Sequence, residues 1–332
     1  MRPRWEGTMA ITRRGALAGI AGLAALPAPA LAQAFPSRTM TLVVPFPAGG
    51  PADVFGRLLA KGMSERLGQS VVVDNKTGVA GVTGVDFVAK SAPDGHVFGL
   101  GSPSALTLMP QLLATIPYDA GKDLAPITLV TRVQEVLGVY PGLGINTVAD
   151  LVTKAKAEPG KINYGSAGLG GITHLAGELF KREAGIEIVH VPYRGAAPAV
   201  VDLLAGRVQM AILDITAMLA HFRTGALKPL MMTSAKRSPL LPDVPNAVEA
   251  GFPKVISDNW YALLTASGVP AAARARLNAA AVDTLKQKDV IDAFAAQGGI
   301  VDPGTSEAVV AHIAEERARW SAIIKAANIK ID

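Results

Sequence analysis

The sequence predicts an α/β protein of two lobes. Each lobe is expected to be a mixed, mostly parallel sheet flanked by helices, and crossing hinge strands are expected to join the two lobes. Half of the 332 residues are hydrophobic and 18% are charged, so the chain can bury a core large enough for two domains. Short β-branched runs alternate with longer amphipathic stretches, as in α/β proteins with parallel sheets. Two β-rich segments, ITLVTR and EVLGVY, separate one such series from the next.

The first α/β series begins with an apolar run and continues into an amphipathic helix. Residues 41–46 are rich in β-branched side chains, which predicts a strand. The helix predicted over 52–67 places five apolar side chains on one face: Val54, Leu58, Leu59, Met63 and Leu67. The elements expected next are a strand at 70–74, a helix at 82–90, a strand at 97–101 and a helix at 105–113.

The second series has the same alternation. It predicts helices at 147–157, 173–184 and 198–204, and strands at 162–164, 186–191 and 208–213. The run LKPLMMTSAKRSP then predicts a strand that leaves this region. The C-terminal third gives a strand at 261–265 and three alanine-rich helical stretches, which would have a thin core as a separate domain. We therefore expect lobe 1 to comprise 33–131 and 233–332, and lobe 2 to comprise 132–232.

The first 32 residues are typical of a cleaved export signal. Arg13 and Arg14 precede an apolar run that is shorter than the roughly 20 residues of a membrane-spanning helix. Ala30-Leu31-Ala32 fits a small-x-small cleavage pattern, so cleavage is expected before Gln33 and the mature protein is expected in the periplasm. The paired arginines resemble a twin-arginine signal, with ordinary secretion and a start at Met9 left open.

The formal net charge of +5 gives little reason to expect a nucleic-acid partner. Segment 1–32 contains four arginines and one glutamate, so the mature part has 28 basic and 26 acidic side chains and no basic cluster. Cysteine is absent, which excludes thiol chemistry and cysteine metal sites. We expect no nucleic acid partner and no cofactor.

Two glycine-rich turns stand between a predicted strand and a predicted helix. The first is Pro47-Ala48-Gly49-Gly50, and the second runs from Tyr164 to Gly171. Helix N-termini have unpaired N–H groups and partial positive charge, so such turns can bind an anion without a basic side chain. Their presence in both lobes favours a ligand site between the lobes, although glycines also occur in such turns for backbone reasons alone. Ser102 and Ser104 belong to a third candidate turn.

Catalytic and nucleotide motifs find little support. No GxxxxGK[ST] follows a strand, and GSAGLGG does not match GxGxxG. Tyr164 occupies a position where a GxSxG nucleophile elbow around Ser166 needs glycine. His174 and Glu178 are four residues apart but lack a third ligand, so no metal is expected. Asp214, at a strand end, could accept from a ligand amine or amide, or could cap the next helix.

Several long motifs resemble one family over essentially the whole mature chain. They are FPSRTMTLVVPFPAGGPAD, APDGHVFGLGSPSA, KINYGSAGLGGITHLAGELFKREAG, VHVPYRGAAPAVVDLLAGRVQMAI and NWYALLTASGVPAAARARLN. The chain resembles the extracytoplasmic receptors of the tripartite tricarboxylate transporter family, also called Bug-type receptors. This resemblance implies a periplasmic-binding-protein-like fold and a receptor, not an enzyme, that closes on a small carboxylate and presents it to membrane permease subunits.

The resemblance also implies which residues bind the ligand. The carboxylate end is assigned to the first turn, Ser102 and Ser104 form nearby wall, the second turn contributes from lobe 2, and Asp214 tunes specificity. The full set is Pro47, Ala48, Gly49, Gly50, Ser102, Ser104, Ser166, Gly168, Gly171, Thr173, His174 and Asp214. Ile172 stands where a threonine is expected, which leaves the ligand open among organic acids, amino acids and aromatic carboxylates or amides.

Two other functions remain open on the sequence. One is an exported hydrolase that uses Ser166 with His174 or Asp214. The other is a sensor that passes its ligand-bound form to a signalling partner. For a receptor we expect a monomer, and we expect Gly49→Val to block binding by filling the ligand's place.

Overall fold

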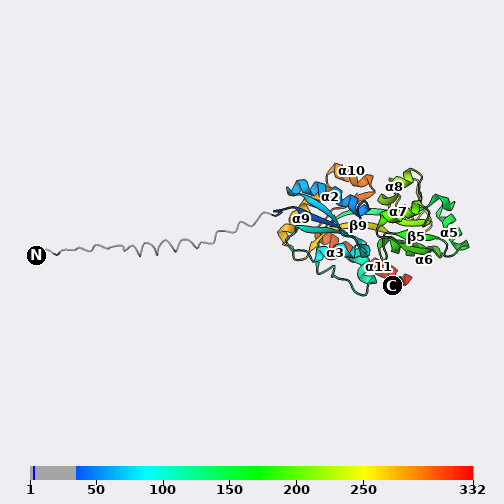
Figure 1. The fold of residues 1–332 in the computed structure, drawn as a ribbon, viewed down its shortest axis with the longest axis horizontal. Helices are drawn as coiled ribbons and strands as arrows, with labels where there is room; N and C mark the ends of the chain where they lie inside the picture. Colours follow the sequence, from blue (N-terminus) through cyan, green and yellow to red (C-terminus); the bar gives the residue numbers. More distant parts are fainter. Residues whose placement is uncertain (1–2, 4–34, 332) are drawn as a thin grey trace. The chain divides into compact units, whose positions relative to one another are not determined.

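The computed structural model describes residue 3 and residues 35–331, so the predicted export signal lies outside the described residues (Figure 1). The part from Pro36 onward forms one compact unit. Within it, strands and helices are arranged as two lobes, which confirms the predicted α/β fold class. Within the described residues, no helix is both long and apolar enough to cross a membrane.

The sheet of lobe 1 is parallel at its edge and antiparallel toward the centre of the molecule. β1 pairs in parallel with both β2 and β3, and β9 runs antiparallel between β3 and β4. The strands are β1 (Met40–Val44), β2 (Val71–Asn75), β3 (Val97–Gly101), β9 (Asp258–Ala266) and β10 (Gly299–Val301), which pairs with β4.

The sheet of lobe 2 has the same mixed character. β5 pairs in parallel with β6 and β7, whereas β7 and β8 run antiparallel to β4. The strands are β5 (Asn163–Ser166), β6 (Val189–Pro192), β7 (Met210–Asp214) and β8 (Lys228–Met232). The strand expected at 186–191 therefore begins only at Val189.

One long strand connects the lobes. The two predicted segments ITLVTR and EVLGVY form a single strand, β4 (Leu124–Val139). Its residues up to Gln134 pair with β9, and its residues from Glu135 onward pair with β7 and β8. The division at this point agrees with the crossing expected from the sequence, while the lobe boundaries at 131/132 and 232/233 stay a prediction.

The helices lie on both faces of the sheets, and most of those predicted with bounds begin within one or two residues of the predicted position. An exception is 105–113, which is π-helical over Ser104–Leu108 before a short α-helix, α4. The helices are α2 (Pro51–Leu67), α3 (Val82–Ala89), α4 (Met109–Leu112), α5 (Val148–Ala157), α6 (Ile172–Ala184), α7 (Ala196–Leu204), α8 (Ile215–Arg223), α9 (Ala271–Leu285), α10 (Lys288–Ala296) and α11 (Ser306–Ala327).

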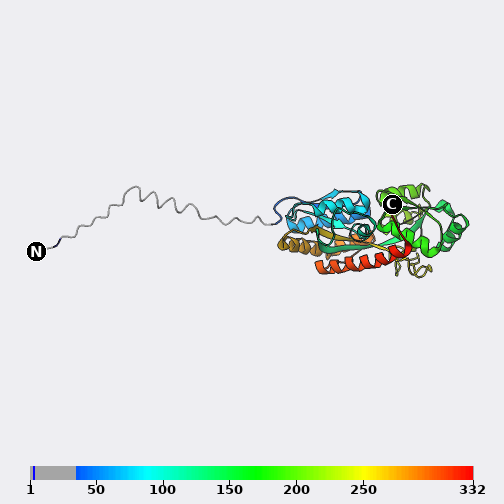
Figure 2. The same ribbon diagram turned by 90° about the horizontal axis from the view of Figure 1, so that it is seen from below.

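The C-terminal helix touches both lobes. α9 and α10 pack on α2 of lobe 1, but α11 also contacts α6 of lobe 2. Trp320 of α11 is fully buried in a small core with Leu108 from one lobe and Ile172 and Leu175 from the other. Figure 2 shows α11, in orange and red, extending along the molecule toward the green lobe. Large apolar side chains therefore connect the lobes on the side of α11.

Candidate functional site

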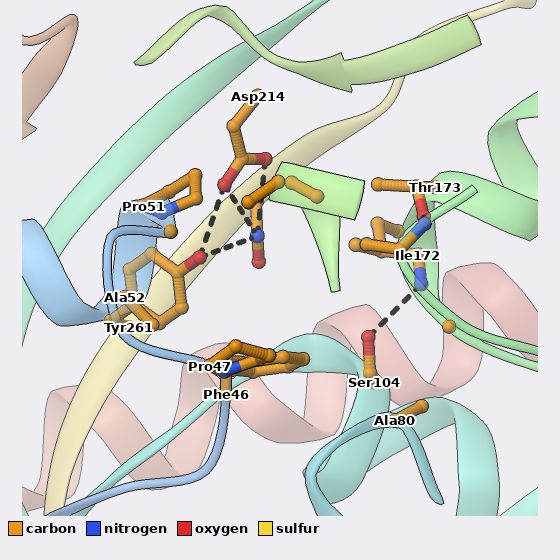
Figure 3. Close-up of a pocket in the computed structure, with 16 residues that line it drawn as sticks. Phe46, Pro47, Pro51, Ala52, Ala80, Ser104, Ile172, Thr173, Asp214 and Tyr261 are labelled. Atoms are coloured by element: carbon orange, nitrogen blue, oxygen red, sulfur yellow. Dashed lines mark hydrogen bonds between the residues drawn. The ribbon is translucent and has the colours of Figure 1, made fainter. Parts of the chain in front are cut away.

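A cavity lies between the two lobes, and both glycine turns contribute to its wall (Figure 3). The volume in which a water-sized molecule fits is about 30 Å³, so the two lobes leave only a narrow space between them. Sixteen residues line it: Phe46, Pro47, Gly50, Pro51, Ala52, Ala80, Ser104, Ala167, Gly171, Ile172, Thr173, Ala196, Ala197, Asp214, Asn259 and Tyr261.

The first glycine turn places the N-terminus of α2 at the cavity. Gly50 is the N-cap and makes no side-chain cap, and Pro51 at the first helical position has no N–H to satisfy. The N–H of Asp53 donates to the carbonyl of Gly50, so the first turn of the helix is hydrogen-bonded to the glycine turn. Ala52, between them, lines the cavity. The start of α2 therefore presents backbone and small side chains to a ligand.

Gly49 belongs to this turn but stands outside the cavity wall. Its φ of +77° favours glycine, and its N–H donates to the Asp53 carboxylate at 2.9 Å. A methyl group at Gly49 would meet no atom within 4 Å, and both Gly49 and Ala48 are exposed. The expectation that Gly49→Val blocks binding by filling the ligand's place stays a prediction, since the structure has open space at this position.

Asp53 fixes the shape of the first turn. Burial alone would raise its pKa, but hydrogen bonds from Arg57, from the Gly49 N–H and from Asn75 together lower it. The carboxylate is thus ionised, and its oxygens accept hydrogen bonds from residues of its own lobe. It positions the turn and lies outside the set of residues that line the cavity.

The second glycine turn brings the N-terminus of α6 to the opposite wall. Gly171 is the N-cap of α6, and Thr173 Oγ1 accepts a hydrogen bond from the Ala167 N–H at 2.9 Å. The N–H of Ile172 donates to Ser104 Oγ at 3.0 Å, which is a buried hydrogen bond between the lobes (Figure 3). Ile172 therefore takes part in lobe closure through its backbone, in the place where a threonine hydroxyl was expected.

A third helix begins at the same cavity. α7 starts after Gly195 with Ala196 and Ala197, and both residues line the wall. The N-termini of α2, α6 and α7 consequently converge on one space. Each has partial positive charge, and no side chain lining the cavity is basic. Helix N-termini arranged in this way can stabilise an anion without a basic side chain.

Asp214 lies at another part of the wall in a hydrogen-bonded group with two residues of β9. Asn259 Nδ2 donates to both carboxylate oxygens, at 3.1 and 3.0 Å, and the Tyr261 hydroxyl donates to Oδ2 at 3.0 Å. Burial raises the pKa of Asp214 to about 7, against the opposing effect of these hydrogen bonds. Asp214 is the N-cap residue of α8, as one alternative expected, but its carboxylate makes no capping hydrogen bond.

A second buried carboxyl lies next to Asp214 on the hinge strand. Glu135 of β4 is paired in register with Asp214 of β7. Burial, followed by the nearby Asp214 charge, raises the pKa of Glu135 well above its usual value, and Ser257 donates a short hydrogen bond to it. Burial thus favours the neutral form of Glu135, whose register partner Asp214 lines the cavity.

Several predicted site residues lie behind the cavity wall. Ser166 is fully buried, with its Oγ 2.7 Å from His190 Nε2, and His174 Nδ1 accepts the Gly170 N–H at 3.1 Å. The two imidazoles are stacked with centroids 3.8 Å apart. Ala48, Gly49, Ser102 and Gly168 are likewise absent from the lining set. Ser166 and His174 thus support the second turn from its own lobe.

The stacked imidazoles are neutral at pH 7. Burial lowers the pKa of His174 to about 4, and burial together with the neighbouring His174 lowers the pKa of His190 to about 3. Ser166 pairs with His190, and the pairing with His174 or Asp214 that the hydrolase alternative requires is not formed among the described residues. The described residues also contain no group of three potential metal ligands.

Ten of the wall residues lie outside the predicted set of ligand-binding residues. Tyr261 had been assigned only to a strand, Asn259 lay before that strand, and Ala80 had been assigned only to a connection before a helix. The added residues are Phe46, Pro51, Ala52, Ala80, Ala167, Ile172, Ala196, Ala197, Asn259 and Tyr261. Six of the predicted residues do line the cavity: Pro47, Gly50, Ser104, Gly171, Thr173 and Asp214.

Comparison with known proteins gives matches over nearly the whole chain. A family model described as the tripartite tricarboxylate transporter family receptor matches residues 55–329. Protein BugT of Bordetella pertussis is 38% identical over 325 residues, which cover 97% of this chain and 100% of BugT.

Solved structures agree with these matches. R. palustris Rpa4515 with adipate has a TM-score of 0.87 and 35% identity, covering 89% of this chain and 99% of that one. MatC (Rpa3494) from Rhodopseudomonas palustris with bound malate has a TM-score of 0.83 and 29% identity, covering 87% and 100%. The likeness therefore extends over both lobes.

Proposed function

This chain belongs to the family of tripartite tricarboxylate transporter receptors, and we propose that its interlobe cavity captures a small carboxylate for delivery to the membrane permease subunits of such a transporter. The observation that supports this proposal most strongly is the convergence of three helix N-termini on a cavity without a basic side chain. Partial positive charge at helix N-termini favours a carboxylate.

The cavity favours a ligand with a second polar group. Asp214, Asn259 and Tyr261 are buried and hydrogen-bonded to one another at a distinct part of the wall. A buried polar group discriminates strongly against ligands that cannot pair with it. We therefore propose a ligand whose carboxylate meets the helix N-termini and whose other end carries a carboxyl, hydroxyl, amine or amide group that pairs with this triad. Adipate and malate, found in the two related structures, are of this class.

A thermal-shift screen followed by calorimetry tests the proposal. The panel contains dicarboxylates including adipate and malate, amino acids, and aromatic acids with their amides. At least one carboxylate is expected to raise the melting temperature by mass action and to bind with micromolar or lower Kd. The ester or primary amide of the best ligand is the control, and it should bind far more weakly. No response to any acid at millimolar concentration would contradict the proposal.

The export and partner assignments are tested separately. Mass spectrometry of protein from the periplasm is expected to give an N-terminus at Gln33. Ligand-dependent capture of permease subunits supports delivery to a transporter, whereas ligand-dependent capture of a signalling protein supports the sensor alternative. Labelling of Ser166 by a serine-reactive probe with turnover of esters would support the hydrolase alternative. Its complete burial makes labelling unexpected.

A further inference from the structure

Two adjacent residues of the segment between β2 and α3 have a backbone conformation that side chains disfavour. Val79 has φ of +46°, and Ala80 has φ of +51° and ψ of +34°. Among the described residues, one other non-glycine residue has positive φ, Asn328 at the end of α11. A β-carbon in this region collides with the backbone, and the collision is worst for a β-branched residue such as valine. Glycine would avoid this strain at both positions.

The two strained side chains have different surroundings. Val79 is 55% exposed and does not line the cavity. Ala80 lines the cavity and lies against the second glycine turn of the other lobe. A methyl group built on Gly171 would lie 3.5 Å from Ala80 Cβ, and one built on Gly168 would lie 3.6 Å from it. In Figure 3 Ala80 lies beside Ser104, opposite Ile172. Its methyl group thus occupies space between the lobes at the edge of the cavity.

From this position we infer that Ala80 is a specificity-determining residue. Its methyl group sets the longest carboxylate ligand around which the two lobes can close. The backbone at Ala80 suits glycine better than alanine, so the methyl group is present despite a conformational cost. This methyl group fills part of the cavity wall, at the place where the wall faces the second glycine turn of the opposite lobe. The inference rests on the proposed function, because it concerns the ligand of the same cavity.

Ala80→Gly and Val79→Gly form a matched pair that separates the cavity effect from the release of strain. Both variants remove a β-carbon from the left-handed region, but only Ala80→Gly enlarges the cavity. The Kd of wild type and both variants is measured by calorimetry for succinate, glutarate, adipate and pimelate. Ala80→Gly should shift the ratio of affinities toward the longer acids by about tenfold, as one methylene in a pocket does. Val79→Gly should keep the wild-type ratio.

Three outcomes would overturn the inference. A wild-type ratio in Ala80→Gly would show that the methyl group does not limit ligand length. An equal shift in Val79→Gly would assign the effect to backbone strain. In both cases wild-type binding of a carboxylate would leave the proposed function intact. A wild-type protein that binds none of the acids, in this series or in the wider screen, would refute the proposed function and the inference together.

Discussion

Removing the Ser104 hydroxyl should weaken ligand binding without weakening the fold. Ser104 Oγ accepts the N–H of Ile172 at 3.0 Å, and this hydrogen bond joins the two lobes beside the cavity. When the lobes part, water can reach both groups. In the closed form of a Ser104→Ala variant, the N–H at the first position of α6 would be buried without a partner. The variant therefore penalises closure alone.

The size of the effect follows from the burial of this N–H. Leaving a buried donor unsatisfied costs about 1–3 kcal/mol. If the ligand binds only when the lobes close, the whole cost appears in the binding free energy, and Kd should rise by about 5- to 150-fold. Calorimetry with the best carboxylate of the screen measures this change. The free energy of unfolding without ligand, measured in urea, should differ from wild type by less than about 0.5 kcal/mol.

Ser102→Ala is the matched control for this prediction. Ser102 is two residues away and fully buried, and its Oγ has no hydrogen-bond partner in the described part of the chain. Its removal should leave Kd within about twofold of wild type, since no bond between lobes is lost. Equal Kd values for Ser104→Ala and wild type would refute the reasoning, and so would equal losses in the two alanine variants.

Three further variants test closure, the polar triad and the histidine pair. In Gly195→Ala the added methyl group would lie 2.8 Å from the Pro47 ring and oppose lobe closure, so the binding free energy measured by calorimetry should weaken by about 1–3 kcal/mol. The control is Gly225→Ala, which also has positive φ but open space around the added methyl group, and it should bind with wild-type affinity. Asp214→Asn sets an amide NH₂ against that of its asparagine partner, so urea unfolding should show about 1–3 kcal/mol less stability, and no loss would contradict the geometry. In the folded protein the pKa of His174 is about 4, against an ordinary value of 6.5. The unfolded state therefore binds more protons between these two pH values, and the free energy of unfolding falls by about 3 kcal/mol as the pH falls through them. His174→Gln should reduce this pH dependence, and equal pH dependence in the variant and wild type would count against a buried neutral imidazole.

The sequence predicted the order of elements well, but only six of the twelve predicted ligand-binding residues line the cavity. Periodicity reports which side of an element is apolar, whereas a cavity wall depends on which side chains meet across two lobes. Ser102 and Ser104 look equivalent in sequence, yet a π-helical turn directs only Ser104 to the other lobe. Ser166 follows the predicted strand, but its hydroxyl pairs with His190 inside its own lobe. Asn259 gave no signal, because its partner is distant in the chain.

Two glycines of lobe 2, Gly171 and Gly195, lie where side chains of lobe 1 approach closely. Gly195 has φ of +109° and would need glycine for its backbone alone, but it also lies against Pro47 of the other lobe. Gly171 is the more informative case. Any residue can adopt its φ of −78°, yet a methyl group there would lie 3.3 Å from the Gly168 carbonyl oxygen of its own turn, 3.3 Å from Ser104 Oγ and 3.5 Å from Ala80 Cβ. Side chains of lobe 1 thus meet bare backbone of lobe 2. The proposed binding of one anion by helix N-termini of both lobes, without a cationic side chain, requires such a close approach.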